Sequence, residues 1–99
     1  MNVKKTVSAE RMELALEGKL DSVSAPKFEA EISGKLKGIT DLAVDLGEVE
    51  YVSSAGLRAL LFLQQRMEDV GGKMTVRNVP KIVMKIFEVT GFTDIITVI

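Results

Sequence analysis

The sequence predicts an α/β fold, a mixed and mostly parallel sheet of about five strands with three main helices packed mainly on one face. Two observations support this prediction: the apolar patterns of the segments and the order in which the segments follow one another. Short runs with a period-two or continuous apolar pattern alternate with longer runs in which apolar residues recur every three or four positions. The resulting order is strand, strand, helix, strand, helix, strand, helix, strand. Helices placed between strands favour parallel pairing with right-handed crossovers.

The first two strands are predicted from short patterns near the start of the chain. Residues 2–8 form the weaker one, because Val3 and Val7 are their only apolar members. Residues 12–17 alternate methionine or leucine with glutamate or alanine, which is typical of a half-buried strand. A turn near residues 8–11 would make these two strands neighbours.

Three segments carry apolar residues at helical spacing, as helices packed on one side do. They cover about 25–37, 55–70 and 80–90. Each segment is followed directly by a glycine, which commonly ends a helix. We therefore expect the first helix to end at Gly38 and the last at Gly91.

Three further strands are expected between and after these helices. Residues 41–46 are apolar on both faces, which is typical of a central strand that is covered on both sides. Residues 73–77 and 95–99 supply the remaining two. Glu48 and Glu50 are expected in a loop after the central strand. Two nearby carboxylates could act as a catalytic acid and base, but no nucleophile, histidine or metal cluster accompanies them, so we interpret both as solvated.

Composition limits the classes of function. The 99 residues suffice for one hydrophobic core, so we expect a single domain over residues 1–99. A formal net charge of −1 gives no basic excess for nucleic acid. Cysteine and histidine are both absent, so we expect no metal, no cofactor and no enzymatic activity. No signal peptide or membrane span is readable, and we expect a cytoplasmic protein that is monomeric when free.

The stretch from Tyr51 to Arg58 joins the central strand to the second helix. Ser54, at the start of that helix, has two compatible interpretations. Its hydroxyl could cap the helix, or it could carry a phosphoryl group that meets backbone N–H donors and the positive end of the helix dipole. Gly56 could permit close packing against a neighbouring strand, or it could let a partner approach. Arg58 lies one helical turn after Ser54 and could pair with a phosphate, although a solvated arginine is the commoner outcome.

The segment Tyr-Val-Ser-Ser-Ala-Gly-Leu-Arg (residues 51–58) resembles the signature of the STAS family, in particular of the bacterial anti-sigma factor antagonists. The resemblance extends over essentially the whole chain. It includes Leu16–Asp21, Val44–Leu46, Gly71–Met74 and Val89–Phe92 in the order and spacing of that family. It implies a STAS-like fold.

The resemblance also implies a function and a site. Ser54 matches the phosphate acceptor, and Asp21 and Ser53 line the same site. Many members have aspartate where this chain has Ser53, which makes Ser53 an alternative acceptor. The partner-binding residues implied are Asp21, Ser53, Ser54, Ala55, Gly56, Leu57 and Arg58.

The implied mechanism is partner switching. The unphosphorylated protein would bind an anti-sigma factor and free a sigma factor. The same anti-sigma factor would act as the serine kinase, and a serine phosphatase would reset the switch. The alternative is a STAS scaffold, or a subunit of a signalling or transport assembly, that works without phosphorylation.

Overall fold

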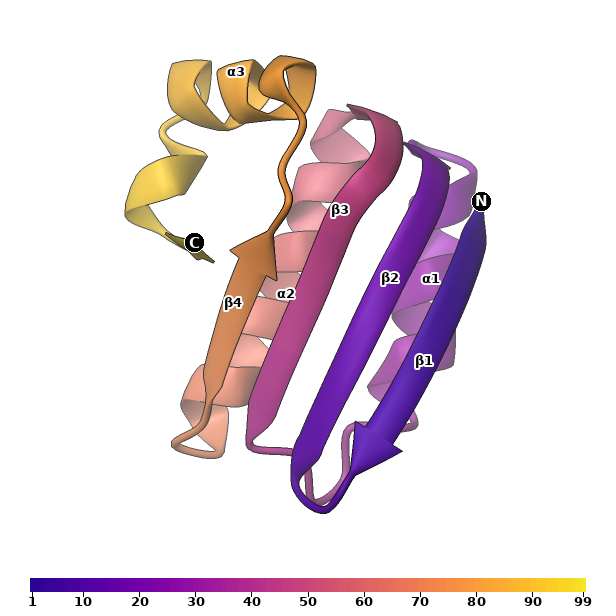
Figure 1. Cartoon of the computed structure of the whole chain (residues 1–99), viewed down its shortest axis with the longest axis vertical. Helices are drawn as coiled ribbons and strands as arrows, with labels where there is room; N and C mark the ends of the chain where they lie inside the picture. Colours follow the sequence, from indigo (N-terminus) through magenta and orange to yellow (C-terminus); the bar gives the residue numbers. More distant parts are fainter.

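The computed structural model describes all 99 residues, and its centre is one five-stranded sheet in the order β1-β2-β3-β4-β5. The strands are β1 (Asn2–Ser8), β2 (Arg11–Leu20), β3 (Asp41–Val52), β4 (Lys73–Arg77) and β5 (Thr97–Val98). β1 and β2 are antiparallel, and every other neighbouring pair is parallel. The predicted mixed, mostly parallel sheet is therefore confirmed (Figure 1).

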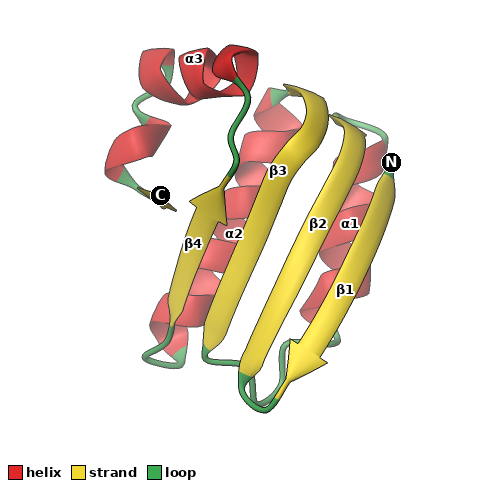
Figure 2. Ribbon diagram, in the orientation of Figure 1, coloured by secondary structure: helices red, strands yellow, loops and turns green.

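The helices are α1 (Ser24–Ser33), α2 (Ser54–Asp69) and α3 (Lys81–Val89), and a short 3-10 helix, Phe92–Asp94, follows α3. α1 and α2 cover one face of the sheet, and α3 lies across the end at which β3 and β4 finish (Figure 2). The predicted count of three main helices is confirmed. No helix is both long and apolar enough to cross a lipid bilayer.

A single cluster of 24 buried apolar residues fills the space between the sheet and the helices. β2 supplies Met12, Leu14 and Leu16 from one side of its pleat, each at most 1% exposed. Phe28 of α1 and Leu60 of α2 pack against the same cluster. The period-two pattern in the sequence thus marks the face of β2 that the helices cover.

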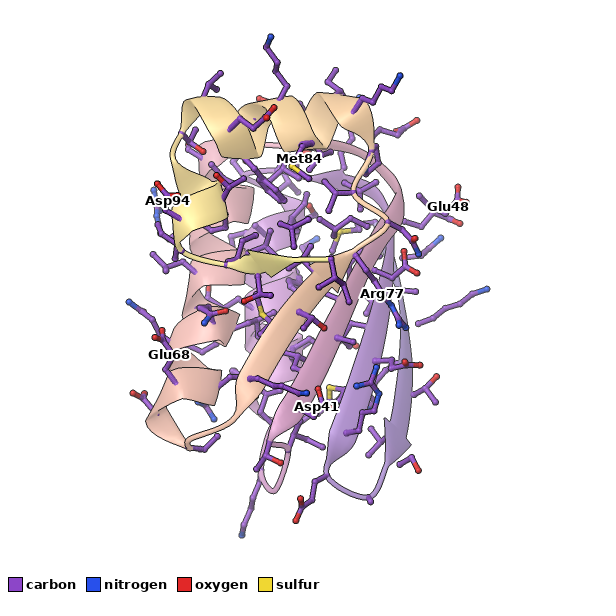
Figure 3. All side chains as sticks on the ribbon, turned by 60° about the vertical axis from the view of Figure 1, so that its left-hand side comes forward. Asp41, Glu48, Glu68, Arg77, Met84 and Asp94 are labelled. Atoms are coloured by element: carbon purple, nitrogen blue, oxygen red, sulfur yellow. The ribbon has the colours of Figure 1, made fainter.

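The other face of the sheet is polar, and charged side chains bridge three strands across it. Arg11 donates to Asp41 at 2.7 Å and to Glu13 at 3.0 Å, and Arg77 donates to Glu13 at 2.8 Å. Asp41 and Arg77 both lie on this face in Figure 3. Ala43 is 1% exposed here, between its partners Glu13 and Thr75 in the flanking strands. The prediction of a central strand covered on both sides thus holds on this face for Ala43 alone, because Asp41 and Asp45 are half-exposed and no helix covers them.

The predicted end of the central strand was wrong, because β3 continues from Leu46 to Val52. Two register shifts against β2 each insert an extra residue into β3. Consequently Leu46, Val49 and Val52 recur every third position and all point into the core. Glu48 and Glu50 therefore lie in the strand and not in a loop. Glu48 points away from the sheet into solvent (Figure 3).

The first helix is also shorter than predicted. α1 ends at Ser33 with Gly34 as its C-cap, and not at Lys37 before Gly38. Leu36 is 3% exposed, so its spacing of four from Ile32 reflects burial in the loop rather than helix. Gly38 has a φ of +81°, which belongs to a turn in that loop.

The last strand is shorter than the predicted 95–99, because β5 covers Thr97 and Val98 alone. Both residues pair with β4, and the N–H of Ile99 donates to the carbonyl of Val76 at 3.0 Å. Ile96 is 5% exposed and packs into the core just before β5. Because Ile96 is apolar and buried, the sequence pattern of residues 95–99 resembles that of a longer strand.

Candidate functional site

The site predicted from the sequence forms where β2 and β3 end side by side. Leu20 and Val52 are the last paired residues of these parallel strands. The N–H of Ser53 donates to the carbonyl of Leu20 at 2.9 Å. The loops that begin at Asp21 and Ser53 therefore leave the sheet together, at the end from which α2 starts.

Ser53, not Ser54, caps α2. Its backbone is extended (φ −85°, ψ 177°), and its Oγ accepts a hydrogen bond from the N–H of Gly56 at 3.3 Å. The interpretation of Ser54 as the cap was wrong, because Ser54 is already the first helical residue. Its side chain is exposed and forms no hydrogen bond within the chain. The two adjacent serines thus have different structural roles.

Replacing Ser53 with alanine is expected to lower the free energy of unfolding by about 1 kcal/mol, the usual effect of losing a cap. Ser54→Ala should change it by less than about 0.5 kcal/mol, because no contact is lost. Urea denaturation of the two variants beside wild type measures the difference. Equal losses for both variants would contradict the assignment of the cap to Ser53.

Gly56 is buried against the end of β2. A β-carbon added there would lie 2.4 Å from the Leu20 carbonyl oxygen and 2.9 Å from Cγ1 of Val52. Such distances are shorter than carbon atoms tolerate, so only glycine lets α2 approach the sheet this closely. The interpretation of Gly56 as a close-packing residue is confirmed.

Asp21 closes the turn that leads into α1. Its Oδ1 accepts from the N–H groups of Ser24 and Val23, each at 3.0 Å. The hydroxyl of Ser24 returns the interaction by accepting from the N–H of Asp21 at 3.0 Å, and it donates to the Lys19 carbonyl at 2.6 Å. These bonds, first that from Ser24 and then that from Val23, lower the pKa of Asp21 below its usual value. The Ser22–Pro26 segment, with its two hydroxyls, is a helix entrance by sequence, and the structure assigns the reciprocal bonds with Asp21 to Ser24.

The lowered pKa of Asp21 gives a stability difference that depends on pH. A carboxylate with a lower pKa in the folded chain stabilises the fold while it is charged, and this contribution disappears as pH falls below the unfolded value of about 3.8. Wild type should therefore unfold at a higher temperature than Asp21→Ala near neutral pH, and the gap should narrow in acid. Thermal unfolding at a series of pH values tests this. A gap that is constant with pH would contradict it.

The other predicted partner-binding residues surround the start of α2. Ser54 and Arg58 are exposed, whereas Ala55 and Leu57 are half-buried. Arg58 is in no ion pair, and so its guanidinium is available one turn from Ser54. The structure thus leaves an exposed hydroxyl and an exposed cation on one turn of helix.

Exposed side chains from neighbouring elements extend this surface. Tyr51, on the last stretch of β3, is 45% exposed, and Val23, in the loop after Asp21, is 67% exposed. Glu50 is exposed on the same stretch of β3. The end of the sheet therefore combines apolar and acidic groups around the start of α2.

Comparison with known proteins identifies the family. A family model described as "Mlab, STAS domain" matches residues 3–98. The chain belongs to the STAS domain family. This STAS domain is 34% identical over 84 residues to BtrV of Bordetella bronchiseptica, which is named as an anti-sigma factor antagonist, with 84% of this chain and 72% of BtrV covered. It is 25% identical over 87 residues to the anti-sigma-B factor antagonist of Bacillus subtilis, covering 88% and 80% of the two chains.

Solved structures share the fold of this STAS domain at low sequence identity. A Thermotoga maritima protein named as an anti-sigma factor antagonist has a TM-score of 0.90 at 16% identity, with 97% of this chain and 84% of that chain covered. The Bacillus cell fate determinant SpoIIAA, in its phosphorylated form, has a TM-score of 0.76 at 20% identity, with 99% and 91% covered. These likenesses support the STAS fold over the whole chain.

Proposed function

We propose that this STAS domain is an anti-sigma factor antagonist that binds an anti-sigma factor when Ser54 is unmodified. Phosphorylation of Ser54 by a serine kinase, which is the anti-sigma factor itself, ends the complex, and a serine phosphatase restores it. The protein acts as a binding partner and a kinase substrate rather than as an enzyme. The names of BtrV and of the Bacillus subtilis relative support this assignment.

The exposed, unbonded hydroxyl of Ser54 is the observation on which the proposal rests. Ser53 uses its own oxygen to cap α2 and is partly buried, so its hydroxyl is the less accessible of the two. A kinase can reach Ser54 without first breaking a hydrogen bond within the chain. Ser54 is therefore the acceptor in this proposal, and Ser53 the alternative.

The switch acts through charge. A phosphoryl group adds about −1.5 to −2 charges at neutral pH. The surface where the partner docks already includes the exposed carboxylate of Glu50. A second carboxylate, that of Asp21, belongs to the loop that starts beside Ser53. Added negative charge would oppose docking by repulsion, desolvation and bulk, with no need for the fold to change.

The proposal is tested by incubating the protein with ATP, magnesium and the anti-sigma kinase of its own genome, and then measuring intact mass. One added phosphate in wild type and in Ser53→Ala, with none in Ser54→Ala, is the expected result. Phosphate that is lost only in Ser53→Ala would move the acceptor to Ser53.

No added mass, with a kinase that is active on another substrate, would favour the unphosphorylated scaffold or transport subunit. The STAS fold also occurs in a sulfate transporter family protein of Wolinella succinogenes, with a TM-score of 0.76 at 16% identity.

A further inference from the structure

β1 is a long free edge of the sheet. It pairs with β2 on one side, and no strand pairs with the other (Figure 1). Six of its seven residues are exposed, with Val3 the exception. Such an edge presents unpaired backbone N–H and C=O groups that another strand can join. The opposite edge, β5, has only two residues.

The side of β1 that faces the helix layer is incompletely covered. Val3, Lys5 and Val7 pair with Leu16, Leu14 and Met12 of β2, so they share the face that the helices cover. Their partners in β2 are at most 1% exposed, yet Val7 is 52% exposed. α1 makes its main sheet contacts with β2 rather than with β1. Val3 and Val7 therefore form a partly exposed apolar surface beside the free edge.

A pocket of about 230 Å³ opens between the start of β1 and α1. Its apolar lining comes from Met1, Val3, Val23 and Phe28. Two charged residues also line it, Lys27, which has no ion-pair partner, and Glu31, whose charge is paired with Lys35 at 3.5 Å. Its volume suits one or two aliphatic side chains. A strand added along β1 would carry alternate side chains on this side of the sheet, within reach of the pocket.

The charges on and beside β1 indicate which strand would fit. Lys4 and Lys5 occupy the middle of β1, and neither they nor Lys27 form an ion pair within the chain. Antiparallel pairing of two copies about the centre of β1 would set Lys5 of one copy opposite Lys5 of the other, and like charges directly opposite destabilise a strand pair. An acidic strand from a different protein would instead place carboxylates against them.

We propose that β1 is a docking edge for an extended acidic segment of a partner protein. The segment adds to the sheet beside β1, inserts an apolar side chain into the pocket next to α1 and places carboxylates against Lys5 and Lys27. This interaction goes beyond the proposed switch at Ser54, because β2 separates β1 from the strand that leads to Ser53.

The test is titration of the ¹⁵N-labelled protein with an extended peptide of threonine and valine that has two glutamates, two positions apart, at its centre, so that both carboxylates lie on one side of the added strand. Amide shifts in β1 and near Lys27 and Phe28 are expected at millimolar peptide. The same peptide with two central lysines should bind about tenfold more weakly. No shifts in β1, or equal binding of the two peptides, would overturn the proposal.

Matched variants separate this edge from general charge effects. Lys5→Glu should weaken binding of the glutamate peptide about tenfold and restore binding of the lysine peptide. Lys85→Glu, at an exposed lysine on α3, should change neither. Sedimentation without peptide provides a further test. A dimer of wild type that Lys5→Glu disrupts would overturn the proposal in favour of a second copy at this edge.

Discussion

Replacing Gly56 with alanine is expected to lower the free energy of unfolding by about 3 kcal/mol. The new β-carbon would meet the Leu20 carbonyl oxygen at 2.4 Å and Cγ1 of Val52 at 2.9 Å. Neither neighbour is free to retreat, because the carbonyl accepts the bond from Ser53 and Val52 is 1% exposed in the core. α2 would have to move away from β2, which would loosen the packing of its buried residues.

Urea denaturation measures this loss, and Gly34→Ala is the matched control. Gly34 has no atom within 4 Å of an added β-carbon, and its backbone is already right-handed (φ −78°, ψ −5°). Alanine there should leave stability unchanged or raise it by about 0.5 kcal/mol, because it restricts the unfolded chain. If Gly56→Ala unfolds at the same urea concentration as Gly34→Ala, the close approach of α2 to β2 is not a constraint on the fold.

The sequence predicted the type and order of the main elements because each has a strong local pattern. Met12, Leu14 and Leu16 alternate, and the stripe of α2 recurs at helical spacing, so these patterns identify strand and helix without tertiary information. The resemblance at residues 51–58 then gave the family. The fold class follows from such elements, since helices between strands permit few topologies.

Element ends were less predictable because burial outside regular structure imitates it. Leu36 continues the spacing of α1 by packing into the core from a loop. In β3, two inserted residues change the apolar period from two to three, which no alternation test detects. The positions of such inserted residues can be identified only from the pairing of β3 with β2.

The roles of residues within the site depend on backbone geometry that the sequence does not encode locally. Adjacent serines have equal capping propensity, and sequence alone could not assign the cap. The extended backbone of Ser53 and its bond to Gly56 decide the assignment. The function of Gly56 was likewise open between packing and partner access until its distance to Leu20 was known.

Ser54→Asp is expected to bind the anti-sigma partner about 100-fold more weakly than wild type, whereas Ser54→Ala binds with unchanged affinity. An aspartate at this exposed position adds a negative charge where the proposed partner docks, and a like-charge contact costs several kcal/mol in such an interface. Isothermal titration calorimetry of the variants against the anti-sigma factor measures the change. Ser8→Asp, at an exposed position near the opposite end of the sheet, is the control for added charge alone.

The stability of Ser54→Asp separates an effect on the interface from an effect on the fold. A negative charge in the first turn of α2 interacts favourably with the helix dipole, by about 0.3 to 1 kcal/mol, so the variant should be at least as stable as wild type. If Ser54→Asp is as stable in urea as wild type but binds the partner more weakly, the added charge acts on the docking surface and not on the fold. Equal affinities for Ser54→Ala and Ser54→Asp, or an equal loss in Ser8→Asp, would mean that charge at Ser54 is not what releases the partner.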